Sequence, residues 1–177
     1  MNPVAFSTSS SQAILAFLSQ NPHQSFFSAQ IAEKTSLSQG GTNQSLRVLA
    51  DQGVLKTEKK GRMVFYSVDV KSPLIRQYKV LQNIALLDDV VKKIKPFAER
   101  VVLFGSCARG EDTQESDIDI LIISRDKERV RPLVPSTKLK RNIQLLLKSP
   151  QEYINWENKE PVFFKEVVQG VVLWQKE

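Results

Sequence analysis

The sequence contains very little cysteine and histidine, and this scarcity excludes several common kinds of site. Its 177 residues include one cysteine, Cys107, and one histidine, His23. A single cysteine cannot form a disulfide within the chain, and the two residues together cannot supply the four ligands of a structural zinc site. We therefore expect neither a cysteine redox relay nor a Ser-His-Asp triad.

Long apolar runs are missing as well. No run approaches the roughly 20 residues that a membrane-spanning helix needs. The N-terminal segment has neither a basic start nor a long apolar stretch, so it does not indicate a secretory signal. We therefore expect a cytoplasmic protein that does not enter a membrane.

Length and charge leave more possibilities open. With 41% apolar residues the chain can bury a sizeable core, in one domain or in two small ones. The 25 Lys and Arg residues outnumber the 19 Asp and Glu residues, which gives a net charge of +6. This charge permits a polyanionic partner without requiring one.

The first 70 residues have the pattern of three helices followed by a hairpin. Apolar spacing predicts a helix over Ser9–Gln20, a short helix over residues 28–35, and a third over about residues 42–52, after a turn at residues 36–41. Two strand-like runs, at residues 54–58 and 63–68, flank a Lys59-Lys60-Gly61-Arg62 turn.

Three segments of this half point to a known family. They are Ser28-Ala-Gln-Ile-Ala-Glu-Lys-Thr, Ser45-Leu-Arg-Val-Leu-Ala-Asp-Gln-Gly-Val-Leu and Gly61-Arg-Met-Val-Phe-Tyr-Ser-Val. With them, residues 8 to 70 resemble the winged helix-turn-helix domains of small bacterial and archaeal transcription regulators.

The resemblance implies double-stranded DNA as a partner. The third helix would enter the major groove, and the hairpin tip would meet phosphates. The expected DNA-binding residues are Gln39, Thr42, Asn43, Gln44 and Arg47 on the helix, with Lys59, Lys60 and Arg62 on the hairpin. Such modules usually bind two half-sites as symmetric dimers, so we expect a homodimer. Alternatively, these residues form a solvated surface, since residues 1–72 carry a net charge of only +3.

A long amphipathic helix is predicted over residues 73–95, starting at Ser72-Pro73. We interpret it as a connector that becomes the first helix of the next domain. Its apolar stripe either mediates dimerisation or, as we favour, packs under the second domain. The stripe consists of Leu74, Tyr78, Leu81, Ile84, Leu87, Val91 and Ile94.

Residues that carry chemistry are concentrated between positions 101 and 123. Val101–Phe104 reads as a buried strand that ends in Gly105-Ser106, and a glycine there lets the backbone approach a ligand closely. Asp117 and Asp119 precede a second apolar run, Ile120–Ile123, and residues two apart in a strand face the same side.

Two neighbouring carboxylates repel each other unless a cation lies between them. Mg²⁺ prefers one or two carboxylates together with phosphate oxygens, so the aspartates and the Gly-Ser turn make sense as one metal and nucleotide site. Taken separately, the turn could be an ordinary strand-to-helix connection and the aspartates a solvated strand end.

Gly105-Ser106, ten residues, then Asp117-x-Asp119 is the signature of the minimal nucleotidyltransferases, small members of the DNA polymerase beta-like superfamily, and residues 80 to 177 resemble them. The resemblance implies that Gly105 and Ser106 bind the triphosphate, with Arg109 as a further phosphate partner. It also implies that Asp117 and Asp119 are catalytic and bind Mg²⁺, with ATP as the expected nucleotide.

The sequence departs from this family at one position. Family members carry a third acidic residue on a later strand, and here the matching strand, residues 142–147, has Gln144 at that position. Glutamine carries no negative charge and accepts no proton at neutral pH. No carboxylate lies between Glu128 and Glu152, so we expect weaker metal binding unless a more distant acid substitutes.

Two further segments have sequence patterns that predict local structure. The basic stretch from Arg125 to Arg141 contains Pro132 and Pro135 and reads as a solvated loop, or else as a cover over phosphates or an extra nucleic-acid contact. Ser149-Pro150-Gln151-Glu152 predicts a capped helix start.

The predicted fold class is therefore α+β. A three-helix winged helix at residues 1–72 and a connector helix at 73–95 precede a nucleotidyltransferase-type mixed sheet with flanking helices at 96–177. The first functional hypothesis is a DNA-binding regulator whose second domain binds Mg²⁺ and nucleotide but is catalytically weak or inactive. The alternatives are an active nucleotidyltransferase that modifies a protein or a small molecule, and a non-catalytic interaction scaffold.

Overall fold

The computed structural model describes residues 8–134 and 141–177, and it divides into two compact units, Met1–Arg76 and Gln77–Glu177. Helices and sheets occur in both units, which confirms the predicted α+β class. No helix in these two described ranges is long and apolar enough to cross a membrane.

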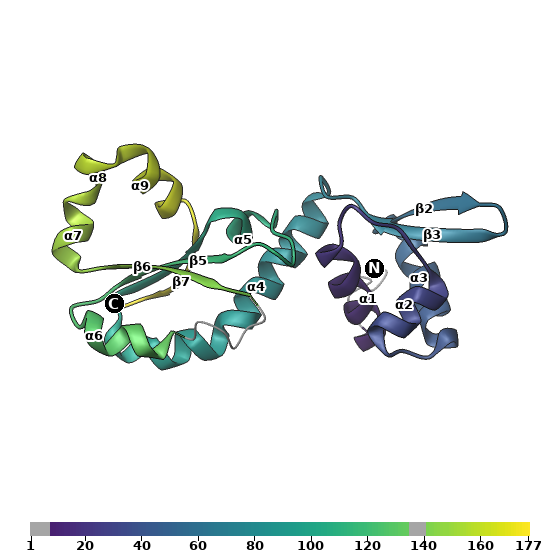
Figure 1. Ribbon diagram of the computed structural model, residues 1–177, viewed down its shortest axis with the longest axis horizontal. Coiled ribbons are helices and arrows are strands. Elements are labelled where there is room, and N and C mark those ends of the chain that lie inside the picture. The colour runs from purple at the N-terminus through teal and green to yellow at the C-terminus, as the bar shows by residue number, and fades with distance from the viewer. Residues whose placement is uncertain (1–7, 135–140) are drawn as a thin grey trace. The chain divides into compact units, whose positions relative to one another are not determined.

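Over residues 8–76, the first unit combines three helices with a small antiparallel sheet (Figure 1). Strand β3 lies between β1 and β2, and β2 and β3 form a hairpin whose last pair is Lys60 and Met63. The three helices and the hairpin follow one another as predicted, whereas the short strand β1 was not predicted. The elements are α1 (Ser9–Gln20), β1 (Phe26–Phe27), α2 (Ser28–Thr35), α3 (Gln39–Asp51), β2 (Leu55–Lys60) and β3 (Met63–Val68).

Helix α3 begins earlier than the sequence predicts. The Ser38 side chain caps it by accepting a hydrogen bond from the Gly41 N–H at 3.2 Å, so residues 39–41 are helical and not part of a turn. Leu46 and Leu49 of α3 are fully buried in the unit. The packed side of α3 thereby fixes which of its side chains face solvent.

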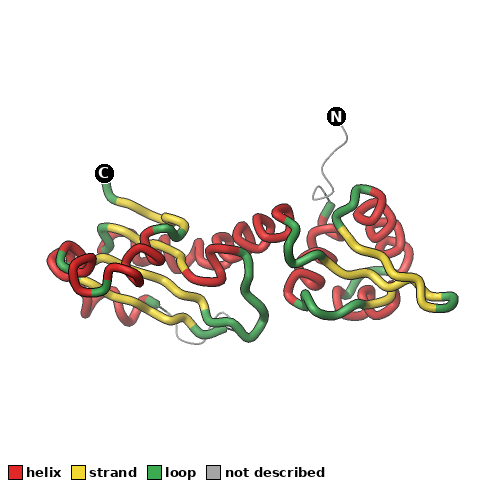
Figure 2. The backbone as a smooth tube through the Cα atoms, turned by 90° about the horizontal axis from the view of Figure 1, so that it is seen from above, coloured by secondary structure: helices red, strands yellow, loops and turns green. Residues whose placement is uncertain are grey.

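The second unit is built on a mixed sheet. In its described part the strand order is β6-β5-β4-β7, with β6 parallel to β5 and the other neighbours antiparallel. The backbone view in Figure 2 shows the strands lying side by side. The strands are β4 (Arg100–Phe104), β5 (Ile118–Ile123), β6 (Ile143–Lys148) and β7 (Val171–Gln175). The helices are α4 (Pro73–Ile94, which begins in the first unit), η1 (Lys95–Phe97), α5 (Gly105–Arg109), α6 (Lys127–Val130), η2 (Arg131–Leu133), α7 (Pro150–Ile154), α8 (Trp156–Lys159) and α9 (Pro161–Val168).

Each face of this sheet has its own apolar core. On one face, Leu87 and Ile94 of α4 pack with Val101 and Ile120, so part of the α4 stripe is buried under the domain as favoured above. Two stripe residues are exposed, Leu74 at 42% and Leu81 at 59%. On the other face, aromatic side chains of the α7–α9 region pack on Val102, Phe104 and Leu121.

The basic stretch after β5 is not simply a solvated loop. Asp126 caps α6 by accepting a hydrogen bond from the Arg129 N–H, and Val130 is fully buried. Residues 127–133 are therefore helical, in α6 and η2. The rest of the predicted stretch, residues 135–140, lies outside the described residues.

Candidate functional site

Gly105 and Asp119 are in close contact at the point where β4 ends. Asp119 of β5 pairs with Phe104, the last residue of β4, and Gly105 follows with a φ of +67°. A Cβ at position 105 would lie 2.3 Å from the Asp119 Oδ2 atom. Both the backbone conformation and this approach require glycine.

The two aspartates differ in their surroundings. Asp117 directly precedes β5 and is exposed, whereas Asp119 is half-buried. Burial raises the pKa of the Asp119 carboxyl above its usual value, and the negative charges of Asp117 and Glu166 raise it further, against the opposing charges of Arg109 and Arg141. Such a carboxylate gains from a bound cation.

Gln144 lies beside Asp119 as its partner in the parallel pairing of β6 with β5, and its side chain is exposed. The position next to Asp119 on this strand therefore carries an amide. Within residues 8–134 and 141–177, no three His, Cys, Asp or Glu side chains form a group that could hold a metal ion.

Arg109 ends the short helix α5, which begins at Gly105 and contains the half-buried Ser106. Its Nε atom lies 3.0 Å from Glu111 Oε2, and its Nη1 atom lies 3.3 Å from Glu166 Oε1 of α9. All three side chains are at least 38% exposed. The guanidinium predicted to bind phosphate is thus paired with two carboxylates.

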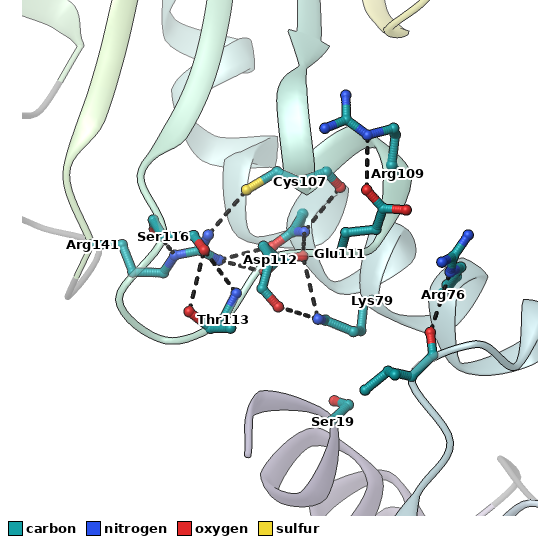
Figure 3. Close-up of polar contacts among 12 residues, drawn as sticks. Ser19, Arg76, Lys79, Cys107, Arg109, Glu111, Asp112, Thr113, Ser116 and Arg141 are labelled. Atoms are coloured by element: carbon teal, nitrogen blue, oxygen red, sulfur yellow. Dashed lines mark hydrogen bonds and ion pairs between the residues drawn. The ribbon is translucent and has the colours of Figure 1, made fainter. Parts of the chain in front are cut away.

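Arg141 holds the loop that leads into Asp117, a role that no sequence pattern predicted. Its Nε donates to the Ser116 carbonyl at 2.8 Å, and its Nη1 donates to Asp112 Oδ2 at 3.0 Å (Figure 3). Its Nη2 donates to the Cys107 sulfur at 3.0 Å. One guanidinium therefore joins the start of β6, helix α5 and the loop before the aspartates.

Arg141 also contacts a buried polar cluster formed by Lys79, Asn83 and Asp112. Lys79 Nζ is 3.7 Å from Asp112 Oδ1, and Asn83 donates hydrogen bonds to Asp112 Oδ1 and to the Cys107 carbonyl. Asp112 is 4% exposed and Lys79 is 7% exposed. Burial lowers the pKa of Lys79, against the charge of Asp112, and burial raises the pKa of the Cys107 thiol to about 11. Cys107 is therefore a packed, protonated thiol.

A separate polar surface lies on α3 of the first unit. Gln39, Asn43, Gln44 and Arg47 are exposed on this helix. The Gln39 amide donates to Asn43 Oδ1 at 3.3 Å, and Ser28 at the start of α2 bonds both side chains. These four residues are available to a partner.

The prediction that Thr42 contacts DNA is wrong. Thr42 is fully buried, because the side of α3 that carries Leu46 and Leu49 faces the core. Its Oγ1 has no hydrogen-bond partner among the described residues. Thr42 cannot reach a partner from this position.

The hairpin tip carries the predicted cations. Lys59, Lys60 and Arg62 are all exposed. Lys60 Nζ lies 3.0 Å from Glu58 Oε2 and 5.1 Å from the centre of the Phe65 ring. Ion pairs this exposed contribute little to stability, so they compete weakly with another anion for the lysine.

Comparison with known proteins gives one family match. The model of the polymerase beta nucleotidyltransferase family matches residues 86–177. A search of curated proteins found no match.

Three solved structures have parts similar to this chain. A predicted DNA-binding transcriptional regulator from E. coli is 25% identical over 45% of this chain and 81% of its own, with a TM-score of 0.40. A mutant of Lactococcus lactis ZitR in complex with DNA is 24% identical over 51% of this chain and 62% of its own, with a TM-score of 0.39. A candidate nucleotidyltransferase from Sulfolobus solfataricus is 22% identical over 57% of this chain and 87% of its own, with a TM-score of 0.39. The chain thus spans less than two thirds of ZitR.

Proposed function

Because the chain belongs to the polymerase beta nucleotidyltransferase family, whose model matches more than half of it, we propose that its second unit binds a nucleoside triphosphate together with Mg²⁺. We also propose that the first unit binds double-stranded DNA. The protein would then be a DNA-binding regulator with a nucleotide-binding domain of weak or absent transfer activity. The contact of Gly105 with Asp119 carries the first part of this proposal.

The donor set beside Gly105 fits Mg²⁺. Asp117 and Asp119 offer carboxylate oxygens on one side of a strand start, and Asp119 is half-buried beside a second negative charge. Oxygen donors of this kind suit a small, hard cation better than a soft one. When bound, the metal would neutralise the carboxylates and the phosphate oxygens together.

The nucleotide would lie along α5. Gly105 brings the start of this helix close to Asp119, Ser106 supplies a hydroxyl, and Arg109 supplies a guanidinium that can bind phosphate with two parallel hydrogen bonds. ATP is the nucleotide that we expect.

Gln144 is the reason to expect weak transfer. A hydroxyl that attacks the α-phosphate must lose its proton, and the amide beside Asp119 cannot accept one. The second metal position also loses one negative ligand. We therefore expect nucleotide binding without fast turnover.

An active transferase is the second candidate, and one observation favours it. Glu166 Oε1 of α9 lies 3.3 Å from Arg109 Nη1, so a carboxylate outside β6 lies next to the proposed phosphate-binding residue. The acceptor would be a protein or a small molecule that carries a nucleophilic hydroxyl. Pyrophosphate would leave as the NMP group is transferred.

The proposed DNA contacts come from α3 and the hairpin. Exposed amide groups of Gln39, Asn43 and Gln44 can bond base edges, and Arg47 can bond bases or phosphates. Lys59, Lys60 and Arg62 would meet phosphates beside the groove. We expect a homodimer on two half-sites, since one small module offers few contacts.

A labelled-ATP experiment tests the nucleotide domain. Binding of α-labelled ATP with MgCl₂ is expected for the natural protein and not for Asp117→Ala or Asp119→Ala. Label that passes to an acceptor would favour the active transferase, and label that stays bound would favour the regulator. No binding of ATP to the natural protein would refute the proposed nucleotide domain and favour a scaffold.

A salt titration tests DNA binding. In gel-shift titrations, replacing Lys59, Lys60 and Arg62 by alanine is expected to weaken binding and to reduce the salt dependence by about one unit of slope per lost phosphate contact. A control with Lys92, Lys93 and Lys159 replaced by alanine removes the same charge from the second unit. Equal losses in both variants would contradict a hairpin contact.

A further inference from the structure

Because β6 carries Gln144 and no carboxylate beside Asp119, a third acidic ligand for the proposed metal would have to come from another element. Helix α9 carries Glu166, and the end of this helix packs against the end of β4. The rings of Phe163 and Phe104 are 6.1 Å apart, and Val171, just after α9, pairs with Leu103. The same end of β4 leads into Gly105, so α9 and the two aspartates are close to one another.

Close packing fixes this arrangement. Gly170 joins α9 to β7, and a Cβ at this position would lie 2.3 Å from the Leu103 carbonyl oxygen. The backbone of the turn therefore lies directly on β4, two residues before Gly105. Helix α9 has little freedom to move away from this end of the sheet.

Glu166 extends from α9 towards α5. Its Oε1 lies 3.3 Å from Arg109 Nη1, and Arg109 lies four residues after Gly105 on α5. Phe164 of α9 packs in the same core as Leu121, which lies two residues after Asp119 on β5, so α9 covers the face of the sheet on which Asp119 lies. The Glu166 side chain is 50% exposed, so it can change its rotamer without unpacking the core.

Arg109 is the group that holds Glu166 in place. The guanidinium is shared between Glu166 and Glu111, and all three side chains are substantially exposed. A triphosphate carries more negative charge than a carboxylate and binds a guanidinium with two parallel hydrogen bonds. It would therefore take Arg109 from the two glutamates, and the Glu166 side chain would then be free to turn towards Asp119.

We propose that Glu166 of α9 supplies the third carboxylate of the metal site, in place of an acid on β6, and that triphosphate binding to Arg109 releases it for this role. The proposal rests on the proposed binding of Mg²⁺ and nucleotide. Glu166 is paired with Arg109, and no three metal-binding side chains of the described residues form a cluster, so Glu166 would have to change its rotamer to join Asp117 and Asp119.

The test measures metal binding without turnover. Mn²⁺ binding is followed by electron paramagnetic resonance, with and without α,β-methylene ATP, an analogue whose α-phosphate cannot be transferred to release pyrophosphate. The variants are Glu166→Gln and Glu111→Gln, each of which removes one ion pair of Arg109. Glu111 is the matched control, because it shares Arg109 but follows α5 and does not lie on α9.

The two variants are expected to differ in Mn²⁺ affinity only when the analogue is bound. With the analogue, Glu166→Gln should weaken Mn²⁺ binding roughly tenfold or more, whereas Glu111→Gln should leave it within about twofold of the natural protein. Without the analogue, both variants should bind Mn²⁺ like the natural protein, since Arg109 then holds Glu166. Adding Gln144→Asp to Glu166→Gln should restore Mn²⁺ binding, and an altered fold would not be restored in this way.

Other outcomes overturn the proposal. Natural affinity in Glu166→Gln with the analogue would mean that Glu166 does not contact the metal, while the proposed binding of Mg²⁺ and nucleotide would stand. Equal losses in both variants would mean that only the Arg109 ion pairs matter. If the natural protein binds no Mn²⁺ with the analogue, both this inference and the proposed nucleotide domain fail.

Discussion

Gln144 lies directly beside Asp119, in the parallel pairing of β6 with β5. The two side chains occupy neighbouring positions at the same level of the sheet, where an acidic residue would complete a ring of carboxylates. The amide has nearly the shape of a carboxylate and lacks its charge. The strength of the proposed metal binding should therefore respond to a single substitution at position 144.

Gln144→Asp is expected to strengthen Mg²⁺ binding in the absence of nucleotide roughly tenfold or more, because it adds a charged oxygen ligand beside Asp119 while Glu166 is paired with Arg109. Isothermal titration calorimetry measures the affinity. Gln144→Asn is the control, since it has the length of aspartate without the charge. Unchanged affinity in Gln144→Asp would mean that the side chain at position 144 does not reach the metal.

Gly105→Ala is expected to lower Mg²⁺ affinity at least tenfold, because the new Cβ would displace the Asp119 carboxylate, and ligand orientation controls affinity on this scale. It should also cost about 1 kcal/mol or more in stability, as alanine does at positive φ. Gly53→Ala is the control, with a φ of +69° and no heavy atom within 4 Å of the added Cβ. Equal Mg²⁺ affinities in the two variants would contradict the close contact described above.

Asp112→Ala is expected to destabilise the second unit by about 3–5 kcal/mol, because it leaves the charges of Lys79 and Arg141 buried without a partner. Urea unfolding followed by tryptophan fluorescence reports on this unit, since Trp156 and Trp174 both belong to it. Asp88→Ala breaks the exposed pair with Lys92 and should cost less than about 1 kcal/mol. Similar small losses of stability in both variants would show that the buried cluster contributes little to the stability of the second unit.

Glu152→Gln is expected to reduce the acid sensitivity of the second unit. The ion pair with Lys127, and then hydrogen bonds from Ser149, lower the pKa of Glu152 from 4.5 to about 2. A lowered carboxyl pKa stabilises the folded state above pH 4.5, and this contribution is lost as the pH falls from 4.5 towards 2. The slope of stability against pH in this window should be smaller in Glu152→Gln.

Lys127→Met removes the first cause of that pKa shift and should have a similar effect. The measurement is the urea midpoint, by tryptophan fluorescence, at several pH values between about 2 and 6. Identical pH profiles for the natural protein and Glu152→Gln would contradict the prediction.

Features set by short stretches of sequence were predicted well. Helix α1 and strand β3 have the predicted bounds, since capping, apolar spacing and alternation act within a few residues. Gly105, Asp119 and Gln144 come together because β4, β5 and β6 are neighbours in the sheet and their register aligns them. The start of α3 was misjudged, because two glycines suggest a turn whereas the Ser38 cap brings them into the helix.

Long-range contacts of charged residues were not predicted. Lys79, Asp112 and Arg141 come from distant positions, and sequence patterns treat such residues as solvated. The one available signal was the pair Lys79 and Asn83, which interrupts the apolar side of α4. Glu166 was missed for the same reason, since its partner Arg109 lies 57 residues away. Thr42 was misplaced because a threonine can occupy either side of a helix.

The position of β7 in the sheet determines when this protein can finish folding during its synthesis. Strand β4 needs β7 as one of its two neighbours, so its pairing is incomplete until residue 175 has left the ribosome. The winged-helix unit has all its strands by residue 68. At translation rates of about 5–20 residues per second, it would be folded for roughly 5–20 s before the second unit could close its sheet.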